Sequence, residues 1–230
     1  MEKLTKAPLN LASITIQFPH QLKVSETRSA YHELVKKDFP LVVFPENREL
    51  KFDFSDCFFR NNEGNAQIRV ATNYFVLETI AYVSKEVFWD SFSKVFFSFV
   101  KLFDIQDVTA LKLSYDNLIM IDNNLVGGEF TDYFSLAAAF RNKEEKKFVT
   151  VDGSFLFAVK DGLVQIEVKP KQNPQTNIWD TFNFKVDCQI NKKLSMEKPD
   201  DLNKAFNSAH QHIEDMFISS LTEKYLASIK

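Results

Sequence analysis

The stretch that decides the fold is KEVFWDSFSKVFFSFVKLF, residues 85–103. Its large apolar side chains recur at spacings of three and four, with charged and hydroxyl side chains between them. Ser84, directly before the run, has the side chain of a helix cap. The pattern predicts an amphipathic helix with an aromatic stripe, which must be covered because an exposed stripe of this length would aggregate. The stripe consists of Phe88, Phe92, Val95, Phe96, Phe99, Leu102 and Phe103.

The segments that precede this helix alternate between strand and helix patterns. Residues 11–18 alternate and are rich in β-branched side chains, and Pro19 closes them. A helical spacing follows and stops before Pro40. A turn-rich loop that contains Gly64 then joins two strand-like runs. We therefore expect strands at 11–18, 49–59 and 67–83, and a helix at 25–37.

The segments that follow the helix repeat the same kinds of element. The dipeptide Asp161-Gly162 lies between two alternating runs and predicts a hairpin, because both residues tolerate a positive φ. Pro170 is expected to end the second of these strands, and Pro199 suits the first turn of a long last helix. We expect strands at 108–121, 148–159, 163–169 and 179–190, and helices at 132–140 and from 199 to about 229.

The order of elements suggests a repeat. The pattern strand, helix, two or three strands, helix occupies residues 1–105 and recurs in residues 106–230, as two β-α-β-β-β-α-like halves. We predict an α+β fold in which the halves form one continuous globular unit by internal duplication. The expected sheet is curved and mainly antiparallel, with the long helices packed on one face. This arrangement resembles saddle-shaped, TATA-binding-protein-like folds in shape, a likeness that implies no function.

Composition restricts the kinds of function. A chain of 230 residues buries roughly 70% of its extended surface and needs no disulfide or structural metal to fold. With 5 Gly in the chain, Gly-rich phosphate loops are disfavoured, and a net charge of −3 is not that of a polyanion binder. The two cysteines, Cys57 and Cys188, lack CxxC spacing and predict reduced, half-buried thiols. Neither a signal peptide nor an apolar run long enough to span a bilayer is evident, so we expect a cytoplasmic protein without membrane contact.

The best enzymatic candidate is Asp152 together with Glu167-Val168-Lys169. An acidic residue, a hairpin and then E-x-K on a strand is the layout of PD-(D/E)xK nucleases, in which the carboxylates hold a divalent cation and the lysine orients the attacking water. The competing interpretation is a plain amphipathic strand whose polar side chains face solvent. The latter is favoured, because E-x-K occurs in many exposed strands.

The other residues that could bind a metal or act in catalysis do not form a recognisable site in the sequence. His210 and His212 lie two apart on a predicted helix, so their side chains point in different directions and do not chelate together. We expect no cofactor and no metal. Aromatic residues on strands could stack bases in a nucleic-acid-binding sheet, but the net charge disfavours this alternative.

Several stretches resemble a sporadically distributed prokaryotic family of uncharacterised proteins of about this length. They are Pro8-Leu9, Phe18-Pro19, Tyr82 to Phe92, Val108 to Asn117, and the last helix with His210, Ile213, Phe217 and Leu221-Thr222. This chain has Ser114 where the family often has Arg, so a role for that charge does not transfer. The resemblance covers most of the chain and implies an accessory role, such as phage defence or toxin neutralisation, without implying an activity.

The sequence therefore favours a non-enzymatic binding or interaction protein that contacts a protein partner or a second copy of itself. A metal-dependent nuclease that uses Asp152, Glu167 and Lys169 is the first alternative. A nucleic-acid-binding sheet is the second.

Overall fold

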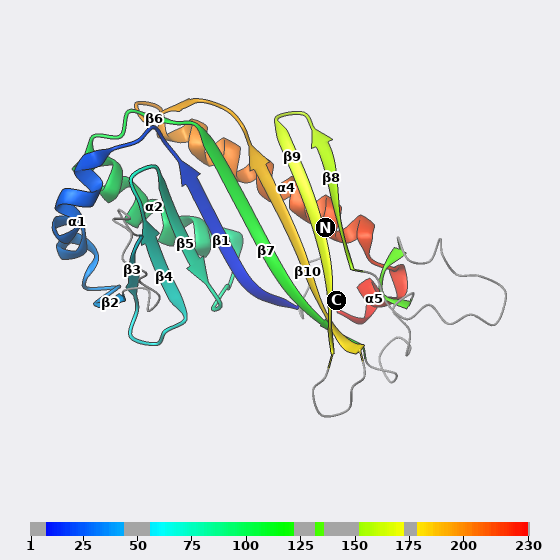
Figure 1. Cartoon of the computed structure of the whole chain (residues 1–230). Coiled ribbons are helices and arrows are strands. Elements are labelled where there is room, and N and C mark those ends of the chain that lie inside the picture. Colours follow the sequence, from blue (N-terminus) through cyan, green and yellow to red (C-terminus); the bar gives the residue numbers. More distant parts are fainter. Residues whose placement is uncertain (1–7, 44–55, 122–131, 136–151, 173–178, 230) are drawn as a thin grey trace.

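The computed structural model describes residues 8–43, 56–121, 132–135, 152–172 and 179–229 (Figure 1). Nine of its strands form one antiparallel sheet: β1 (Leu9–Gln17), β2 (Leu41–Val43), β3 (Cys57–Arg60), β4 (Ala66–Val70), β5 (Tyr74–Thr79), β7 (Ala110–Met120), β8 (Gly153–Val159), β9 (Gly162–Gln172) and β10 (Trp179–Ile190). Two short strands, β6 (Asp107–Val108) and β11 (Leu194–Ser195), pair separately. The helices within the described residues are α1 (Leu22–Val35), α2 (Lys85–Phe103), α4 (Pro199–Ser220) and α5 (Glu223–Ser228). The predicted α+β class with a mainly antiparallel sheet is confirmed.

The strand order is β2-β3-β4-β5-β1-β7-β10-β9-β8, so the first strand of each half lies at the centre. β1 and β7 pair there in antiparallel fashion, from Gln17 opposite Ala110 to Leu9 opposite Asn117. Outward from this pair, the strand that precedes each long helix comes next, as β5 on one side and β10 on the other. The order β1-β5-β4-β3 thus matches the order β7-β10-β9-β8, while β2 is an additional strand of the first half and the origin by duplication stays a prediction.

The helices α2 and α4 lie behind the sheet in Figure 1, on the same face. The aromatic stripe of α2 results from the spacing of its apolar residues by three and four. The helix begins after Ser84, whose side chain accepts the Val87 N–H, and ends at Asp104, which has a left-handed conformation. All stripe residues except the partly buried Leu102 are buried. Their rings surround Phe75 of β5, whose centroid lies 5.2 Å from that of Phe99.

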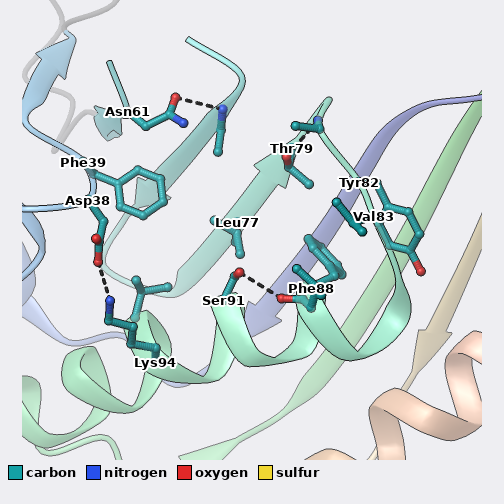
Figure 2. A pocket seen from close by; sticks show the side chains of 14 residues that line it. Asp38, Phe39, Asn61, Leu77, Thr79, Tyr82, Val83, Phe88, Ser91 and Lys94 are labelled. Carbon is teal, nitrogen blue, oxygen red and sulfur yellow. Dashed lines mark hydrogen bonds and ion pairs between the residues drawn. The ribbon is translucent and has the colours of Figure 1, made fainter. Parts of the chain in front are cut away.

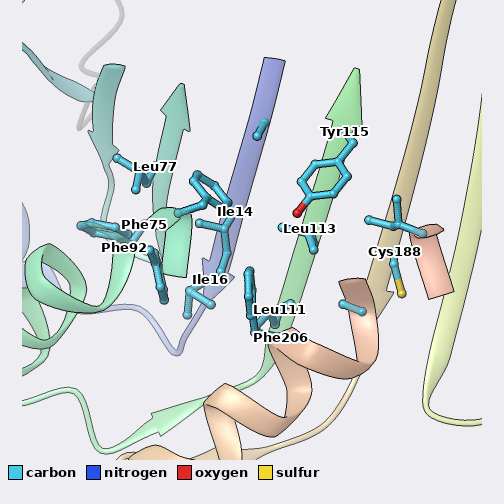
Figure 3. Close-up of a cluster of buried hydrophobic side chains, with 14 of the residues drawn as sticks. Ile14, Ile16, Phe75, Leu77, Phe92, Leu111, Leu113, Tyr115, Cys188 and Phe206 are labelled. Carbon is cyan, nitrogen blue, oxygen red and sulfur yellow. The ribbon is translucent and has the colours of Figure 1, made fainter. Parts of the chain in front are cut away.

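The second helix layer continues this core across the centre of the sheet. Figure 3 shows side chains of β5, β1, β7 and β10 pointing to the helix side, where Phe206 of α4 meets them. The rings of Phe206 and Trp89 of α2 are 4.9 Å apart, so the two helices touch beneath the central strands. Pro199 occupies the first turn of α4, followed by two aspartates at its positive end, as predicted.

Three sequence-based boundaries were wrong. The last helix was expected from 199 to about 229, but α4 ends at Ser220 and a separate helix, α5, begins at Glu223, because Leu221 and Thr222 are extended. Residues 67–83 were expected to be one strand, but they form β4 and β5, joined by a tight turn in which the Ala71 N–H donates to the Tyr74 carbonyl at 3.0 Å. Pro170 was expected to end a strand, but β9 continues through it, opposite Phe182. Its outer side faces no described strand because β8 pairs no further than Val168, so the missing N–H costs no ladder bond.

The predicted hairpin exists, but glycine has a different role in it. Val159 pairs with Gly162, so the turn residues are Lys160 and Asp161, and none of the three residues from Lys160 to Gly162 has a positive φ. A Cβ atom on Gly162 would lie 1.9 Å from the Gln189 carbonyl oxygen. Gly162 is therefore required by the close approach of β10 rather than by turn geometry.

Other expected elements lie partly outside the described residues. These are the beginning of the strand at 49–59, most of the helix at 132–140 and the beginning of the strand at 148–159. The helix expected at 25–37 is α1, which begins at Leu22 and ends at Val35.

Replacing Phe96 by Ala should lower the free energy of unfolding by about 3–5 kcal/mol, because it leaves a cavity at a fully buried site within the stripe. Urea denaturation checks this value. The matched control is Val87→Ala on the same helix, where 49% exposure of the side chain predicts a change within about 0.5 kcal/mol. A loss below about 1 kcal/mol for the Phe96 variant would contradict burial of the stripe.

Candidate functional site

The face of the sheet opposite α2 and α4 carries the alternate side chains of every strand. On β1, Ile14 and Ile16 point to the helices, so Thr15 between them belongs to the other face. Its cross-strand partners are Val76 and Lys112. Figure 1 shows no helix in front of this face among the described residues. We call this surface the open face.

A polar network lies near the centre of the open face. Ser114 of β7 and Asp187 of β10 are directly opposite each other and are each 6% exposed. The Ser114 hydroxyl donates to one carboxylate oxygen of Asp187. The other oxygen is contacted by the ammonium groups of Lys112 at 2.6 Å and Lys185 at 3.2 Å. Both oxygens of the Asp187 carboxylate are thus engaged, so Asp187 is a fixed charge of the open face and not a free base.

An aromatic and cationic group occupies the outer part of the same face. The guanidinium carbon of Arg69 on β4 lies 5.3 Å from the ring centroid of Tyr74 and 6.0 Å from that of Phe58. Asp56 approaches the same guanidinium at 4.0 Å. Two rings and one carboxylate thus surround the guanidinium, and the Arg69 side chain is 35% exposed.

The residues of the nuclease hypothesis lie on the outer strands of the open face. Ser154 pairs with Glu167 and Gly153 with Val168, which places Asp152 beside the end of this ladder. The Lys169 ammonium contacts a Glu167 carboxylate oxygen at 2.6 Å. That hydrogen bond is the main cause of the raised pKa of Lys169, to which the charge of Asp152 adds. Lys169 is therefore committed to Glu167, while Asp152 is exposed.

Metal-binding groups do not gather in the described part of the chain. There, no cluster of three or more His, Cys, Asp or Glu side chains is placed to hold an ion. Cys57 and Cys188 are buried free thiols on two separate strands. Burial raises the pKa of Cys188 to about 12 and also raises that of Cys57, so neither thiol is activated as a nucleophile.

A cavity of about 300 Å³ lies on the helix side, between α2 and the ends of β4 and β5 (Figure 2). Leu77, Phe88 and Val95 form much of its wall. At its rim the Lys94 ammonium contacts an Asp38 carboxylate oxygen at 2.6 Å.

Polar side chains of the cavity are already engaged by the chain itself. The side-chain Oδ1 of Asn61 accepts the Ala66 N–H at 3.1 Å, and the Thr79 hydroxyl donates to the Asn65 backbone carbonyl at 3.1 Å. The Ser91 hydroxyl donates to a helix carbonyl at 2.9 Å. The cavity therefore has an apolar wall, and its lining residues do not direct a set of free hydrogen-bond donors into it.

The ring of His210 on α4 packs into the core edge-on to Tyr115, with centroids 5.7 Å apart. The Tyr115 hydroxyl and the Tyr82 hydroxyl are hydrogen-bonded at 3.2 Å. Nδ1 of His210 is buried without a partner among the described residues. Burial lowers the pKa of His210; nearby charges are those of Lys85, Glu86 and Glu214.

Comparison with known protein families finds none that matches this chain, and no curated protein matches it either. None of the helices in the described segments is long and apolar enough to cross a membrane. What the protein binds must therefore be inferred from its own surfaces.

Lowering the pH should destabilise the protein through His210. Its folded pKa is below the unfolded value of about 6.5, so between these two values the unfolded chain binds more protons and stability falls as pH falls. The slope contributed by this one group is at most about 1.4 kcal/mol per pH unit. Urea unfolding between pH 8 and pH 5 measures it.

Two variants test the assignment to His210. His210→Gln removes the titrating group, and His210→Phe removes it while keeping a ring against Tyr115. Both should flatten the stability profile below a pH of about 6.5. Profiles parallel to that of the wild type would show that another group is responsible.

The nuclease hypothesis has a direct biochemical test. Purified protein incubated with DNA or RNA and Mg²⁺ or Mn²⁺ should leave the nucleic acid intact, because Lys169 is paired with Glu167. Metal-dependent cutting that is lost in Glu167→Gln, but kept in the control Glu78→Gln on the same face, would establish the nuclease instead.

Proposed function

We propose that this protein is a non-enzymatic binding protein and that the open face is its recognition surface for a protein partner. The observation that carries the proposal is that a nine-stranded sheet has both long helices on one side and no described helix on the other. A sheet presents many side chains on one surface. In this sheet each inner strand is hydrogen-bonded to a neighbour on both sides, which fixes the backbone that carries those side chains.

The chemistry of the open face supports a protein as the ligand. Its charged side chains have both signs, and the engaged Asp187 network holds two of its lysines in place. A surface of mixed sign complements another protein surface better than it complements a phosphate backbone. The positive members are Arg60, Arg69, Lys112, Lys169, Lys171 and Lys185, and the negative ones are Glu78, Asp116, Glu167 and Asp187.

The group formed by Arg69, Tyr74 and Phe58 is the best candidate for the energetic centre of that contact. Arginine and tyrosine are enriched among the few residues that dominate binding energy at protein interfaces. Val76 next to this group is on the open face yet 1% exposed, because it is covered by its neighbours, including Thr15 and Arg69 across the ladder. The surface here is closely packed before any partner binds.

The biological setting of the proposal rests on the resemblance to sporadically distributed prokaryotic proteins. It suggests an accessory component of a phage-defence or toxin-neutralising system, acting in the cytoplasm. The partner would then be a protein of that system.

The test is affinity purification from the native host with three forms of the protein. Ser13→Arg places a long charged side chain on the open face between Glu78 and Ser114. Ser29→Arg makes the same substitution at an exposed position of α1 and is the matched control. A partner of the open face should be retained by the wild type and the control, and at least about ten-fold less by Ser13→Arg, a loss of about 1.4 kcal/mol.

Mass spectrometry and nucleic-acid extraction of the eluates identify what is retained. Equal retention of every partner by the two variants would contradict recognition by the open face. Nucleic acid recovered in place of protein, and lost with Ser13→Arg, would support the nucleic-acid-binding alternative.

A further inference from the structure

Strand β8 forms one outer edge of the sheet. Among the described strands it pairs with β9 alone, so the backbone groups on its other side have no ladder partner there. Its sequence, GSFLFAV, contains neither a charge nor a proline over seven residues. Natural edge strands are usually protected by charges, prolines, bulges or shortness. The opposite edge follows this rule, because β2 has three residues.

Both faces of β8 expose large apolar side chains. Phe155, on the helix side, is 39% exposed, and Leu156, on the open face, is 64% exposed. Phe157 is partly buried against the core. An uncharged edge with apolar groups on both sides is suited to pairing with another strand.

The register of such a pairing follows from geometry. Directly opposite residues of antiparallel strands lie on the same face of the sheet. The two-fold axis that relates two copies of β8 must therefore lie midway between the two copies of one residue, so that this residue is opposite itself. Centring the axis on Leu156 pairs all seven residues from Gly153 to Val159, whereas a shift of the axis by one residue leaves two of them unpaired.

This register is also complementary in its side chains. Phe155 of each copy lies opposite Phe157 of the other on the helix side, where the four rings extend the two cores. On the open face, Leu156 of one copy lies opposite Leu156 of the other, and Ser154 of each copy lies opposite Ala158 of the other. Aromatic pairs are among the most favourable cross-strand pairs, and no like charges meet.

We propose that two copies of this chain join through β8, so that their two nine-stranded sheets become one continuous antiparallel sheet. A second copy is the occupant that the structure favours, because the strand complements itself and carries no charge that would select a different partner. The net charge of −3 per chain opposes association weakly. The dimer carries two open faces on one side of the joint sheet, whatever ligand those faces bind.

Charge substitutions at the two-fold axis test both the dimer and its register. By light scattering, the wild type should have twice the protomer mass of 26.7 kDa. Leu156→Lys brings two ammonium groups onto positions whose Cβ atoms are about 5 Å apart, and Leu156→Glu does the same with carboxylates. Each variant alone should be monomeric, with dimerisation weakened at least about ten-fold.

Mixing the two variants should restore the dimer mass. The introduced ammonium group of one copy then faces the introduced carboxylate of the other, and it does so only if the axis passes through this position. Ile80→Lys is the matched control, since Ile80 is 61% exposed and lies outside the edge strand, and this variant should remain dimeric. Far-UV circular dichroism confirms that the variants are folded. A monomeric wild type, a dimeric Leu156→Lys, or a mixture that stays monomeric would each overturn the proposal.

Discussion

Burial of the aromatic stripe of α2 is the interaction on which the rest of the structure depends. The stripe packs around Phe75 and, through Phe99, against Tyr31 of α1, whose hydroxyl donates to the Val95 carbonyl at 3.1 Å. It therefore holds one wing of the sheet and the first helix together. At the other end of α2, Trp89 meets Phe206, so the same helix also anchors α4. Since both helices are committed to one face, the side chains of the other face are left for solvent or a ligand.

Local patterns predicted the elements well, because helix and strand periodicity are properties of neighbouring residues. The stripe of α2, the cap at Ser84 and the strand at 179–190 are all present as expected. The break between β4 and β5 was missed because a short turn at 71–73 leaves the alternation of apolar residues almost uninterrupted. The role of Gly162 was also missed, since it depends on the carbonyl of Gln189, which belongs to a different strand and is distant in the sequence.

The candidate site was less predictable than the fold for the same reason. Lys185 and Asp187 alternate with apolar residues along β10, but this alternation gives no indication that Ser114, 73 residues earlier, lies opposite Asp187. Only the pairing of β7 with β10 turns these residues into a network. The group around Arg69 arises in a similar way from three adjacent strands. In both places, residues that are distant in the sequence meet only through strand pairing.

The central pairing of β1 with β7 has a consequence for how the chain is made. Residues that meet there are far apart in the sequence, from Gln17 with Ala110 to Leu9 with Asn117. The ribosome synthesises β1 before β7, so the side of β1 that pairs with β7 in the complete sheet is unpaired until β7 has been made. Contacts of such long sequence separation also slow folding. The first half, including β5 and α2, is synthesised completely before β7, so β1 can pair with β7 only after most of the sheet strands of the first half have left the ribosome.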